Sequence, residues 1–465
     1  MKVMAVVLAA GQGKRMKSKL YKVLHPVCGK PMVGHIVDTL DEIDTSKTLV
    51  VVGHGAEAVK NFLGDRVSYA MQEEQLGTGH AVLRAKDTIG EEEGYTFVVC
   101  GDTPLVRSET LNKMLELHKN SGAAATILTA RMPDPAGYGR IVRGENGQVA
   151  KIVEQKDCTP EEAAISEINT GTYCFDNRKL FAALSRVTNH NAQKEYYLTD
   201  VIAIFKGDGE TVEAYCTEDP AESIGVNDRI ALSEAERLMK VRINRGHMLN
   251  GVTLIDPDNT YIHKDVKIGS DTVIHPGTIL SGSTVIGEGC IIGPFTHLKD
   301  TRVHDGACIK QSVAQEAEVG AETQVGPFAY LRPGAKLGQG VKIGDFVEVK
   351  NATIGDGSKV SHLSYVGDSL VGKNVNFGCG AVTVNYDGFN KSVCEVEDDA
   401  FVGSNVNLIA PVKIGKGAYV VAGSTITHDV PENDLAIARQ RQTNKSGYAE
   451  IMRKRLLAKK IKNKK

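Results

Sequence analysis

Aliphatic residues recur at every sixth position through most of the second half of the chain, and this repeat restricts the fold more than any other feature. In its longest runs the positions are Ile262, Ile268, Ile274, Leu280, Ile286, Ile292 and Leu298; Val319, Val325, Leu331, Leu337, Ile343 and Val349; and Val396, Val402, Leu408, Ile414, Val420 and Ile426. A coiled-coil heptad has a different period, and a single strand is much shorter. The repeat predicts a parallel β-helix, in which each hexapeptide forms one flat face and the aliphatic side chain points inward.

The phase of this repeat slips between runs and is lost in one place. Short runs at Val360 and Val366, and at Val371 and Phe377, join the longer ones, whereas residues 384–395 carry no repeat. We interpret this stretch as a loop that leaves the β-helix. Long loops in compact domains are often functional, so the loop is a candidate part of a site.

The first half of the chain shows a different alternation. Short β-branched runs lie at 3–8, 48–52, 96–99 and 124–129, and amphipathic stretches lie between or after them at 32–40, 56–62, 79–85 and 109–120. This order predicts βαβ units and an α/β sheet with helices on both faces. Ligands of such sheets bind outside the carboxyl ends of the strands.

These patterns divide the 465 residues into four parts. We expect an α/β domain at 1–227, a helical linker at 228–249, the β-helix at 250–437 and a basic tail at 438–465. From Ile451 onward the tail holds eight Lys or Arg residues and no acid. A solvated or frayed helix is the favoured interpretation, and a cationic arm that touches an anionic ligand or a neighbouring subunit is the alternative.

Composition excludes several classes of protein. Lys and Arg number 55 against 57 Asp and Glu, so no global charge favours nucleic acid. Nine cysteines stand singly, which favours a reducing cytoplasm and argues against a zinc site or a disulfide framework. The apolar start is too short for a convincing signal peptide, and no apolar run approaches the roughly 20 residues of a membrane span.

A glycine-rich loop follows the first expected strand. It consists of Leu8, Ala9, Ala10 and Gly11, followed by Gln-Gly-Lys-Arg-Met. It lacks the spacing of a Walker loop, and Met16 stands where the dinucleotide fingerprint requires its third glycine. Close backbone approach and several cations still suit a nucleoside triphosphate.

Further motifs extend this observation along the chain. Besides L-A-A-G-x-G-x-R-M and Lys22, they include Gln72 in Q-E-x-x-L-G-T-G-H, Gly101-Asp102-Thr103-Pro104-Leu105, Gly137-Tyr138-Gly139-Arg140, Glu154-Gln155-Lys156, Asn169-Thr170-Gly171 and Gly225-Val226-Asn227-Asp228. In this order and over essentially the whole chain, the sequence resembles the bifunctional N-acetylglucosamine-1-phosphate uridylyltransferases/glucosamine-1-phosphate N-acetyltransferases. The resemblance implies a Rossmann-like nucleotidyltransferase domain with a mixed, mainly parallel sheet, a connecting helix and a left-handed β-helix.

The resemblance also implies roles in the first half of the chain. Arg15 and Lys22 would stabilise the phosphates, and Asp102 and Asn227 would hold Mg²⁺. UTP and the UDP-sugar would be bound by Leu8, Ala9, Ala10, Gly11, Lys22, Gln72, Gly77, Thr78, Gly139, Glu154, Asn169 and Asn227. Taken alone, a Gly-Asp pair at the end of a strand is usually a turn, so these assignments depend on the ordered set.

The β-helix carries a polar cluster of its own. Arg332 and Lys350 stand one expected coil apart, and His362 follows. Transfer of an acetyl group to an amine requires a base, and cations suit a sugar phosphate. By resemblance, His362 is the general base and Arg332, Lys350, Tyr365 and Asn376 bind the amino-sugar phosphate. The acetyl-CoA contacts would be Cys379, Asn385, Tyr386, Ser404, Ala422 and Arg439.

One position departs from the family pattern. Cys379 stands where we expect alanine, close to the thioester in this scheme. A thiol there can alter the fit of acetyl-CoA or make the site reactive.

The sequence therefore predicts a cytoplasmic enzyme that makes UDP-N-acetylglucosamine, a precursor of cell-envelope polysaccharides, from glucosamine-1-phosphate, acetyl-CoA and UTP with Mg²⁺. By resemblance it is a homotrimer, with no nucleic acid bound and no stable membrane insertion. The alternative is a sugar-1-phosphate nucleotidyltransferase of other specificity whose β-helix only regulates or oligomerises. A protein that merely binds ligands is least favoured, because Asp102 and Asn227 would then lack a purpose.

Overall fold

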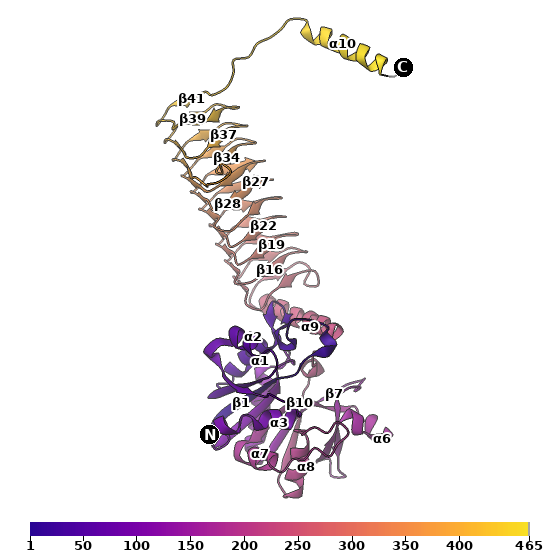
Figure 1. The fold of residues 1–465 in the computed structure, drawn as a ribbon. Helices are drawn as coiled ribbons and strands as arrows, with labels where there is room; N and C mark the ends of the chain where they lie inside the picture. The colour runs from indigo at the N-terminus through magenta and orange to yellow at the C-terminus, as the bar shows by residue number, and fades with distance from the viewer. Residues whose placement is uncertain (464–465) are drawn as a thin grey trace. The chain divides into compact units, whose positions relative to one another are not determined.

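A computed structural model describes residues 1–463 and divides into two compact units (Figure 1). The first unit contains Met1–Leu249 and Tyr261–Val266, and the second contains Asn250–Thr260 and the chain from Lys267 onward. The predicted basic tail at 438–465 includes residues 464 and 465, which lie outside the described residues.

The first unit is built on one mixed sheet. Its strands run in the order β11 (Val212–Cys216), β7 (Ala125–Arg131), β10 (Glu167–Asp176), β6 (Gly94–Cys100), β1 (Lys2–Ala9), β4 (Lys47–Val52) and β5 (Ser68–Met71). A hairpin of β8 (Gly139–Arg143) and β9 (Val149–Val153) joins β10. All neighbours along the main order are parallel except β10, which is antiparallel to both β6 and β7. The expectation of a mixed, mainly parallel sheet is confirmed.

Helices cover both faces of this sheet. One face is covered by α1 (Met32–Asp41), α2 (Ala56–Leu63) and α5 (Ser108–Ser121). The other is covered by α3 (Thr78–Leu83), α4 (Lys86–Ile89), α7 (Asn177–Leu184) and α8 (Asp200–Gly207). The unit also contains α6 (Pro160–Ala163) and α9 (Arg229–Leu249), and the buried apolar residues of α9 belong to a separate core with Val27 and Leu105. Short 3-10 turns lie at Lys14–Met16, Lys22–Leu24, Gly64–Arg66, Gln155–Asp157 and Pro220–Ser223, and a small ladder joins β2 (Pro26–Val27) and β3 (Lys30–Pro31). Strands that alternate with helices are the arrangement that the sequence pattern predicts.

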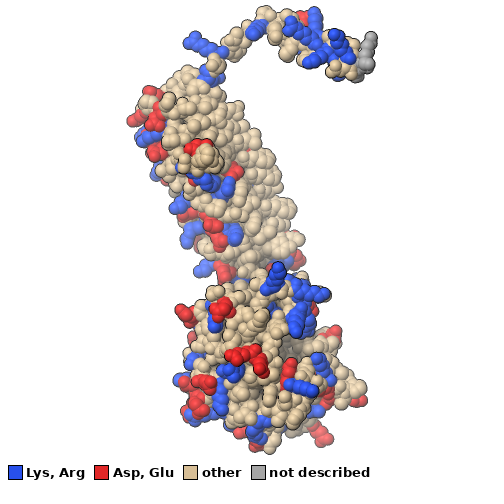
Figure 2. Space-filling view, in the orientation of Figure 1, with Lys and Arg blue, Asp and Glu red and all other residues tan. Residues whose placement is uncertain are grey.

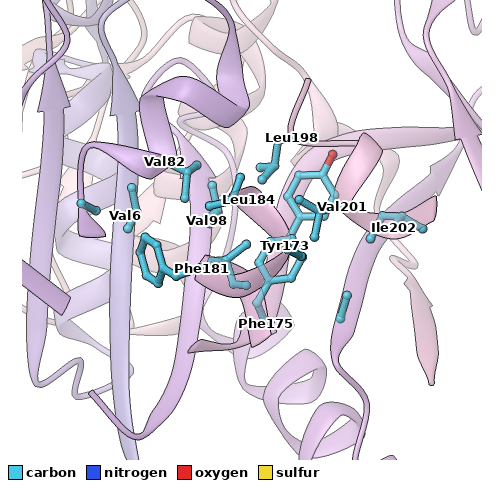
Figure 3. Close-up of a cluster of buried hydrophobic side chains, with 14 of the residues drawn as sticks. Val6, Val82, Val98, Tyr173, Phe175, Phe181, Leu184, Leu198, Val201 and Ile202 are labelled. Atoms are coloured by element: carbon cyan, nitrogen blue, oxygen red, sulfur yellow. The ribbon is translucent and has the colours of Figure 1, made fainter. Parts of the chain in front are cut away.

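Alternate residues of β1 enter two separate cores. Ala5 and Val7 pack with residues of α1, α2 and α5, whereas Met4 and Val6 pack with residues of α3, α7 and α8. Figure 3 shows part of the second core, in which Val6 and the aromatic residues of β10 face helix residues such as Phe181. Burial of each valine, methionine or phenylalanine side chain stabilises the fold by about 1.5–3 kcal/mol. The strand that carries the glycine-rich loop is therefore held in place from both faces.

Acidification is expected to destabilise the first unit through one buried histidine. His118 on α5 is fully buried and contacts the Thr126 hydroxyl through Nδ1. Burial lowers its pKa from 6.5 to about 4, so the unfolded chain takes up this proton first as the pH falls. Stability is complete above the unfolded pKa and falls below it, by about 2 kcal/mol between pH 7 and pH 5. Thermal unfolding at both pH values tests this: a His118→Gln variant loses less stability than the wild type, and an equal loss contradicts the assignment.

The second unit contains a left-handed parallel β-helix with three sheets, drawn as stacked rungs in Figure 1. The first sheet stacks β12 (Thr253–Leu254), β15 (Val273–Ile274), β18 (Ile291–Ile292), β21 (Cys308–Ile309), β24 (Gln324–Val325), β27 (Lys342–Asp345), β30 (Lys359–His362), β33 (Asn376–Phe377), β36 (Phe401–Val402), β39 (Tyr419–Val420) and β41 (Leu435–Ala436). The second stacks β16 (Ile279–Ser281), β19 (His297–Lys299), β22 (Val313–Gln315), β25 (Tyr330–Leu331), β28 (Glu348–Lys350), β31 (Tyr365–Gly367), β34 (Val382–Val384), β37 (Asn407–Ile409) and β40 (Thr425–Ile426). The third stacks β14 (Lys267–Ile268), β17 (Val285–Ile286), β20 (Arg302–Val303), β23 (Glu318–Val319), β26 (Lys336–Leu337), β29 (Thr353–Ile354), β32 (Ser369–Val371), β35 (Cys394–Val396) and β38 (Val412–Ile414). The strand β13 (Tyr261–Ile262) belongs to the first unit.

The coils of this β-helix differ in length, which explains the phase slips of the repeat. Tyr330 pairs with Glu348 in a full coil, but Lys342 pairs with Lys359 in a coil one residue shorter. Ser369 pairs with Cys394 because the chain leaves the helix after β34 and returns at β35. This excursion coincides with the stretch in which the sequence lacks the repeat.

The end of the chain forms helix α10 (Tyr448–Lys462), in which every residue is exposed. The frayed helix and the cationic arm both stay predictions for this tail. Among the described residues, no helix has the length and apolar character that a membrane span requires.

Candidate active sites

The glycine-rich loop leaves the sheet at the carboxyl end of β1, beside the end of β6. Gly13 has a left-handed φ of 61°, and a Cβ there would lie 2.5 Å from Cβ of Lys22. A side chain at this position would therefore displace Lys22. The hydroxyl of Tyr21 donates to the Ala9 carbonyl at 2.6 Å, which anchors the same loop to its neighbour in sequence.

A cavity of about 280 Å³ opens at these strand ends. It is lined by residues predicted to bind the nucleotide or the metal: Leu8, Ala9, Ala10, Gly11, Lys22, Gln72, Gly77, Thr78 and Asp102. Five further lining residues, Val23, Gln75, Ala81, Cys100 and Glu195, were not predicted. The Gln75 amide donates to the Ala10 carbonyl at 2.6 Å. The sequence feature that could have identified Gln75 is its position in the Q-E-x-x-L-G-T-G-H motif, which begins at Gln72.

Lys22 lies between the two residues predicted to hold a cation. Its Nζ is bonded to a carboxylate oxygen of Asp102 and lies 3.2 Å from the side-chain oxygen of Asn227. The backbone N–H of Val226 donates to the Asp102 carbonyl at 2.9 Å, which fixes the two segments to each other. Two side-chain oxygens from distant parts of the chain therefore converge on one positive charge.

A second group of residues shapes one end of the cavity. The Gln72 amide donates to the Gly77 carbonyl at 3.1 Å and contacts Nδ1 of His80 at 3.0 Å. Thr78 accepts a hydrogen bond from the Leu198 N–H at 3.1 Å. Gly77 has φ of 109°, and a Cβ there would lie 2.6 Å from the Tyr196 carbonyl oxygen. A glycine is therefore required at position 77, where the backbone passes close to the backbone of Tyr196.

The residues predicted to hold the sugar do not line this cavity, but some of them lie together. Asn169 is paired with Gly139 across β10 and β8, and its amide donates to the Tyr173 hydroxyl at 2.7 Å. Burial raises the pKa of Glu154, whose carboxylate accepts a hydrogen bond from Thr199 at 3.4 Å. Arg15 lies in the 3-10 turn Lys14–Met16 and is exposed, outside the cavity lining.

The β-helix places the predicted phosphate ligands in neighbouring coils. Leu331 and Val349 pair between β25 and β28, so Arg332 lies over Lys350. Arg332 forms an ion pair with Glu348 at 2.8 Å, and Lys350 forms one with Asp368 at 3.2 Å. Lys391 of the looped-out segment lies beside Lys350, and contact with that ammonium lowers the pKa of Lys391. Several cations therefore gather on one edge.

Asp368 organises this edge, although sequence reasoning did not identify it. It accepts hydrogen bonds from Asn351, at 2.7 Å, and from Asn385. Burial alone would raise the pKa of Asp368, but the hydrogen bonds from Asn351, Asn385 and Lys350 outweigh burial and hold it below its ordinary value. The Asn385 amide also lies 3.4 Å from the Tyr365 hydroxyl. The carboxylate thus connects the looped-out segment to the predicted phosphate site.

His362 has a carboxylate partner on the preceding coil. Its Nδ1 lies 2.8 Å from Oδ1 of Asp345, and the two residues are paired between β27 and β30. The hydrogen bond with His362 lowers the pKa of Asp345, so this group is an acceptor at neutral pH. The imidazole therefore carries its proton on Nδ1, which leaves Nε2 as the basic nitrogen. Its side chain is 60% exposed, so a substrate can reach it.

The remaining predicted residues lie on successive coils beyond His362. The Gly380 N–H donates to the His362 carbonyl, the Asn405 N–H to Cys379, and the Gly423 N–H to Ser404. A Cβ placed on Gly423, the residue after Ala422, would lie 3.8 Å from Cδ of Arg439. Asn376 is on β33, next to β30, and Tyr386 is in the exposed loop. Cys379 lies half-buried in this column, one coil from His362.

The comparisons with known proteins agree with this geometry. A family model described as nucleotidyl transferase matches residues 4–222, and one described as bacterial transferase hexapeptide (six repeats) matches residues 394–428. The bifunctional protein GlmU of Geobacillus sp. (strain WCH70) is 59% identical over 96% of this chain and 97% of its own. The chain belongs to the GlmU family of bifunctional proteins.

Other GlmU proteins match over the same length. That of Exiguobacterium sibiricum is 60% identical over 96% of this chain and 99% of its own, and that of Bacillus subtilis is 58% identical over 97% and 99%. A solved structure titled as a putative glucose-1-phosphate thymidylyltransferase from Bacillus anthracis is 22% identical, with a TM-score of 0.43, over 51% of this chain and 94% of that one.

Membership of the GlmU family confirms the family resemblance seen in the sequence, the enzyme class and the order of the two kinds of domain. The chain is a bifunctional transferase, with a nucleotidyltransferase half followed by a hexapeptide acyltransferase half. The alternative in which the β-helix is only a scaffold is not supported, because both halves match transferases.

Proposed function

We propose that this enzyme acetylates glucosamine-1-phosphate with acetyl-CoA in its β-helix and then transfers a uridylyl group from UTP to the product in its first domain. The observation that carries the proposal is a pair of separate polar sites, one around Lys22 and Asp102, the other around His362 and Asp345. Nine single cysteines support a reducing cytoplasm as the place where it works.

The acetyl step follows from the orientation of His362. Arg332 and Lys350 bind the phosphate of the amino sugar, and Nε2 of His362 removes a proton from its ammonium group. The free amine attacks the thioester carbonyl, the C–N bond forms and the C–S bond breaks. The proton that the new amide nitrogen loses passes to the departing sulfur, which leaves as the thiol of coenzyme A. Tyr365 and Asn376 hold the sugar, and Cys379, Asn385, Tyr386, Ser404, Ala422 and Arg439 hold acetyl-CoA. Cys379 is the departure from the family pattern within this set.

Asp345 is a positioning residue in this scheme. Asp345→Ala removes the acceptor of the Nδ1 proton, and we expect acetyl transfer to slow about tenfold. Asp345→Asn retains an acceptor oxygen and restores most of the rate, a rescue that a purely structural role would not produce. The matched control is Glu318→Ala, because Glu318 pairs with His304 in a similar contact of 2.9 Å on an earlier coil. Equal rates for both Asp345 variants would contradict this role.

The uridylyl step depends on positioning and on neutralisation of charge. The phosphate oxygen of N-acetylglucosamine-1-phosphate attacks the α-phosphorus of UTP, and pyrophosphate leaves. Arg15 and Lys22 stabilise the phosphates beside the loop of Leu8, Ala9, Ala10 and Gly11. Gln72, Gly77 and Thr78 bind the uracil, and Gly139, Glu154, Asn169 and Asn227 hold the sugar.

Mg²⁺ suits the same cavity. The donor set is a carboxylate oxygen of Asp102 and an amide oxygen of Asn227, both already directed at the Lys22 ammonium. These are hard oxygen ligands of the kind that Mg²⁺ prefers. When bound, the ion would offset the negative charge of the phosphates. Lys22 would then be free to contact the phosphates itself.

A homotrimer is supported by an apolar edge of the β-helix. Phe295, Phe328, Phe346 and Leu363 are all more than half exposed and all have left-handed φ. The rings of Phe328 and Phe346 stack with centroids 5.3 Å apart. Leu363 directly follows His362, so a subunit that covered this edge would approach the acetyl site. Large exposed apolar patches mark interaction sites.

Replacement of Phe328 and Phe346 by serine tests the trimer. The wild type is expected to sediment as a trimer and the double variant as a monomer, because the exposed rings no longer gain from burial. A Phe389→Ser variant in the exposed loop, where the ring is 92% exposed and outside this edge, serves as the control. A monomeric wild type would overturn the proposal.

The choice of substrates is tested by competition. Purified enzyme receives equimolar UTP, ATP, GTP and CTP with N-acetylglucosamine-1-phosphate and glucose-1-phosphate, and products are resolved by mass spectrometry. UDP-N-acetylglucosamine is expected to dominate. A predominant UDP-glucose or a thymidylyl-type product in a repeat with dTTP would favour the alternative specificity.

A further inference from the structure

The first unit contains a second cavity, which the reactions above do not use. Its volume is about 700 Å³, and its walls come from α1, from the segment after Asp102 and from α9. Residues that line it include Pro104, Arg107, Arg242 and Arg245. The volume lies within the range of small-molecule sites. None of its lining residues belongs to the cavity at the ends of β1 and β6.

Among the described residues, three of the four Lys and Arg side chains that line this second cavity have no acidic partner. Within residues 1–463, the side chains of Arg242, Arg245 and Lys264 form no ion pair. Figure 2 shows Lys and Arg side chains gathered over α9. Carboxylates also line the cavity, but Asp38 is already bonded to Lys30 and Arg66. Of the remaining acids, Asp219 pairs with Arg107, while Glu42 accepts from Ser108 and Glu109 is exposed.

Two guanidinium groups are held close together in this wall. Arg242 is half-buried and donates to the Leu105 carbonyl at 2.9 Å. Burial and the nearby Arg107 both lower the pKa of Arg242. The Nε of Arg107 is itself buried without a hydrogen bond, and the Glu222 carboxylate lies 3.9 Å away. An anion between these groups would offset their repulsion and accept hydrogen bonds that the protein leaves unmade.

Short stretches of chain connect residues of this cavity to Asp102 and Asn227, the predicted metal ligands. Leu105, which accepts from Arg242, lies three residues after Asp102. The lining residue Asp219 lies shortly before Asn227 in the sequence. The N–H of Val226 joins the two segments through the Asp102 carbonyl. A ligand that moves Arg242 therefore acts on the Leu105 carbonyl and, through this short connection, on Asp102.

We propose that this cavity is a regulatory site for a phosphorylated small molecule, bound by Arg242, Arg245, Lys264 and Arg107. Arg forms bidentate contacts with phosphate, and the cavity has room for a sugar carrying one or two phosphates. The ligand acts on uridylyl transfer by shifting the segment of Asp102. This regulatory effect rests on the proposed function, whereas binding itself does not.

Hydrogen exchange of the full-length protein tests binding without any turnover. Fructose 1,6-bisphosphate is the probe, inorganic phosphate is the smaller probe, and chloride at equal ionic strength is the control. UDP-N-acetylglucosamine and Mg²⁺ are present throughout to occupy the catalytic cavity. The probes are expected to slow exchange in peptides that cover 104–107 and 238–245. The double variant Arg245→Gln/Lys264→Gln is expected to raise the half-saturating concentration of each probe at least about tenfold. Arg237→Gln, on the same helix but paired with Glu234, should match the wild type.

Each result decides one part of the proposal. No slowing in the wild type, or equal slowing in the Arg245→Gln/Lys264→Gln variant, overturns the site. Slowing by chloride to the same extent also overturns it, because the effect is then one of ionic strength. If binding is seen while the uridylyl rate is unchanged at saturating probe, the regulatory effect is overturned and the binding site stands. Loss of uridylyl activity without any probe would instead point to failure of the proposed function.

Discussion

His362→Ala is expected to lower the rate of acetyl transfer by about 10²–10⁴-fold and to leave uridylyl transfer unchanged. Loss of the imidazole removes the basic nitrogen that the contact with Asp345 leaves available. At neutral pH the substrate amine is mainly protonated, so attack on the thioester then depends on the small unprotonated fraction. The two rates are measured separately, by release of free thiol and by release of pyrophosphate.

A matched variant separates chemistry from folding. His304→Ala removes a histidine–carboxylate pair of similar length from an earlier coil, and both rates should stay near those of the wild type. The side chain of His362 is 60% exposed, so its loss should leave thermal unfolding almost unchanged. A fall in both activities, or in neither, would contradict the separate role of His362.

Asp102→Asn is expected to have the opposite selectivity. The substitution keeps the volume but removes the negative charge that faces Lys22 and the proposed Mg²⁺, and uridylyl transfer should fall about 10²–10³-fold. Acetyl transfer should be unaffected, because the β-helix carries its own site. Pyrophosphate release over a range of Mg²⁺ concentrations measures the effect.

The control for this charge is Asp65→Asn, an exposed acid in the same domain without an ion pair among residues 1–463. It should retain full uridylyl activity. If Asp102→Asn is as active as this control at every Mg²⁺ concentration, Asp102 is not a metal ligand. If its activity returns to the wild-type level only at high Mg²⁺, the loss lies in affinity for the ion.

The sequence pattern predicted the fold well where one physical period persists. A six-residue repeat specifies one aliphatic side chain per face, and in the β-helix Leu331 and Val349 are buried on adjacent coils. In the first unit, alternate residues of β1 feed two cores, as a strand covered on both faces requires. The antiparallel direction of β10 was not assigned to that strand, because periodicity carries no information on direction.

The partners of the site residues were harder to predict. Asp345 and His362 meet only because the coil between them is one residue short. A uniform eighteen-residue coil, which the sequence pattern suggested, would have placed Asp345 opposite Leu363, the residue after His362. Asp368 was missed for a related reason: its partner Asn385 lies in the looped-out segment, whose return path has no repeat. Contacts set by coil length and by loops depend on the folded chain.

The roles assigned to the site residues all stay predictions, and some of these residues lie away from the cavity. Arg15 is exposed and outside the cavity at the ends of β1 and β6, and Glu154 and Asn169 lie outside its lining. The cavity is lined by loops such as the one containing Gln72 and Gly77, and binding loops can adjust when substrate arrives. Gln75 and Glu195 deserve substitution alongside them, because both line the cavity.

One measurement tests the two-site proposal most directly. Purified enzyme receives glucosamine-1-phosphate, acetyl-CoA, UTP and Mg²⁺, each component is left out in turn, and the products are identified by mass spectrometry. The proposal predicts UDP-N-acetylglucosamine only when all four are present, with N-acetylglucosamine-1-phosphate able to replace the first two. Formation of a UDP-sugar from N-acetylglucosamine-1-phosphate, but no acetylated product from glucosamine-1-phosphate and acetyl-CoA, would contradict it and would make Cys379 the first residue to replace.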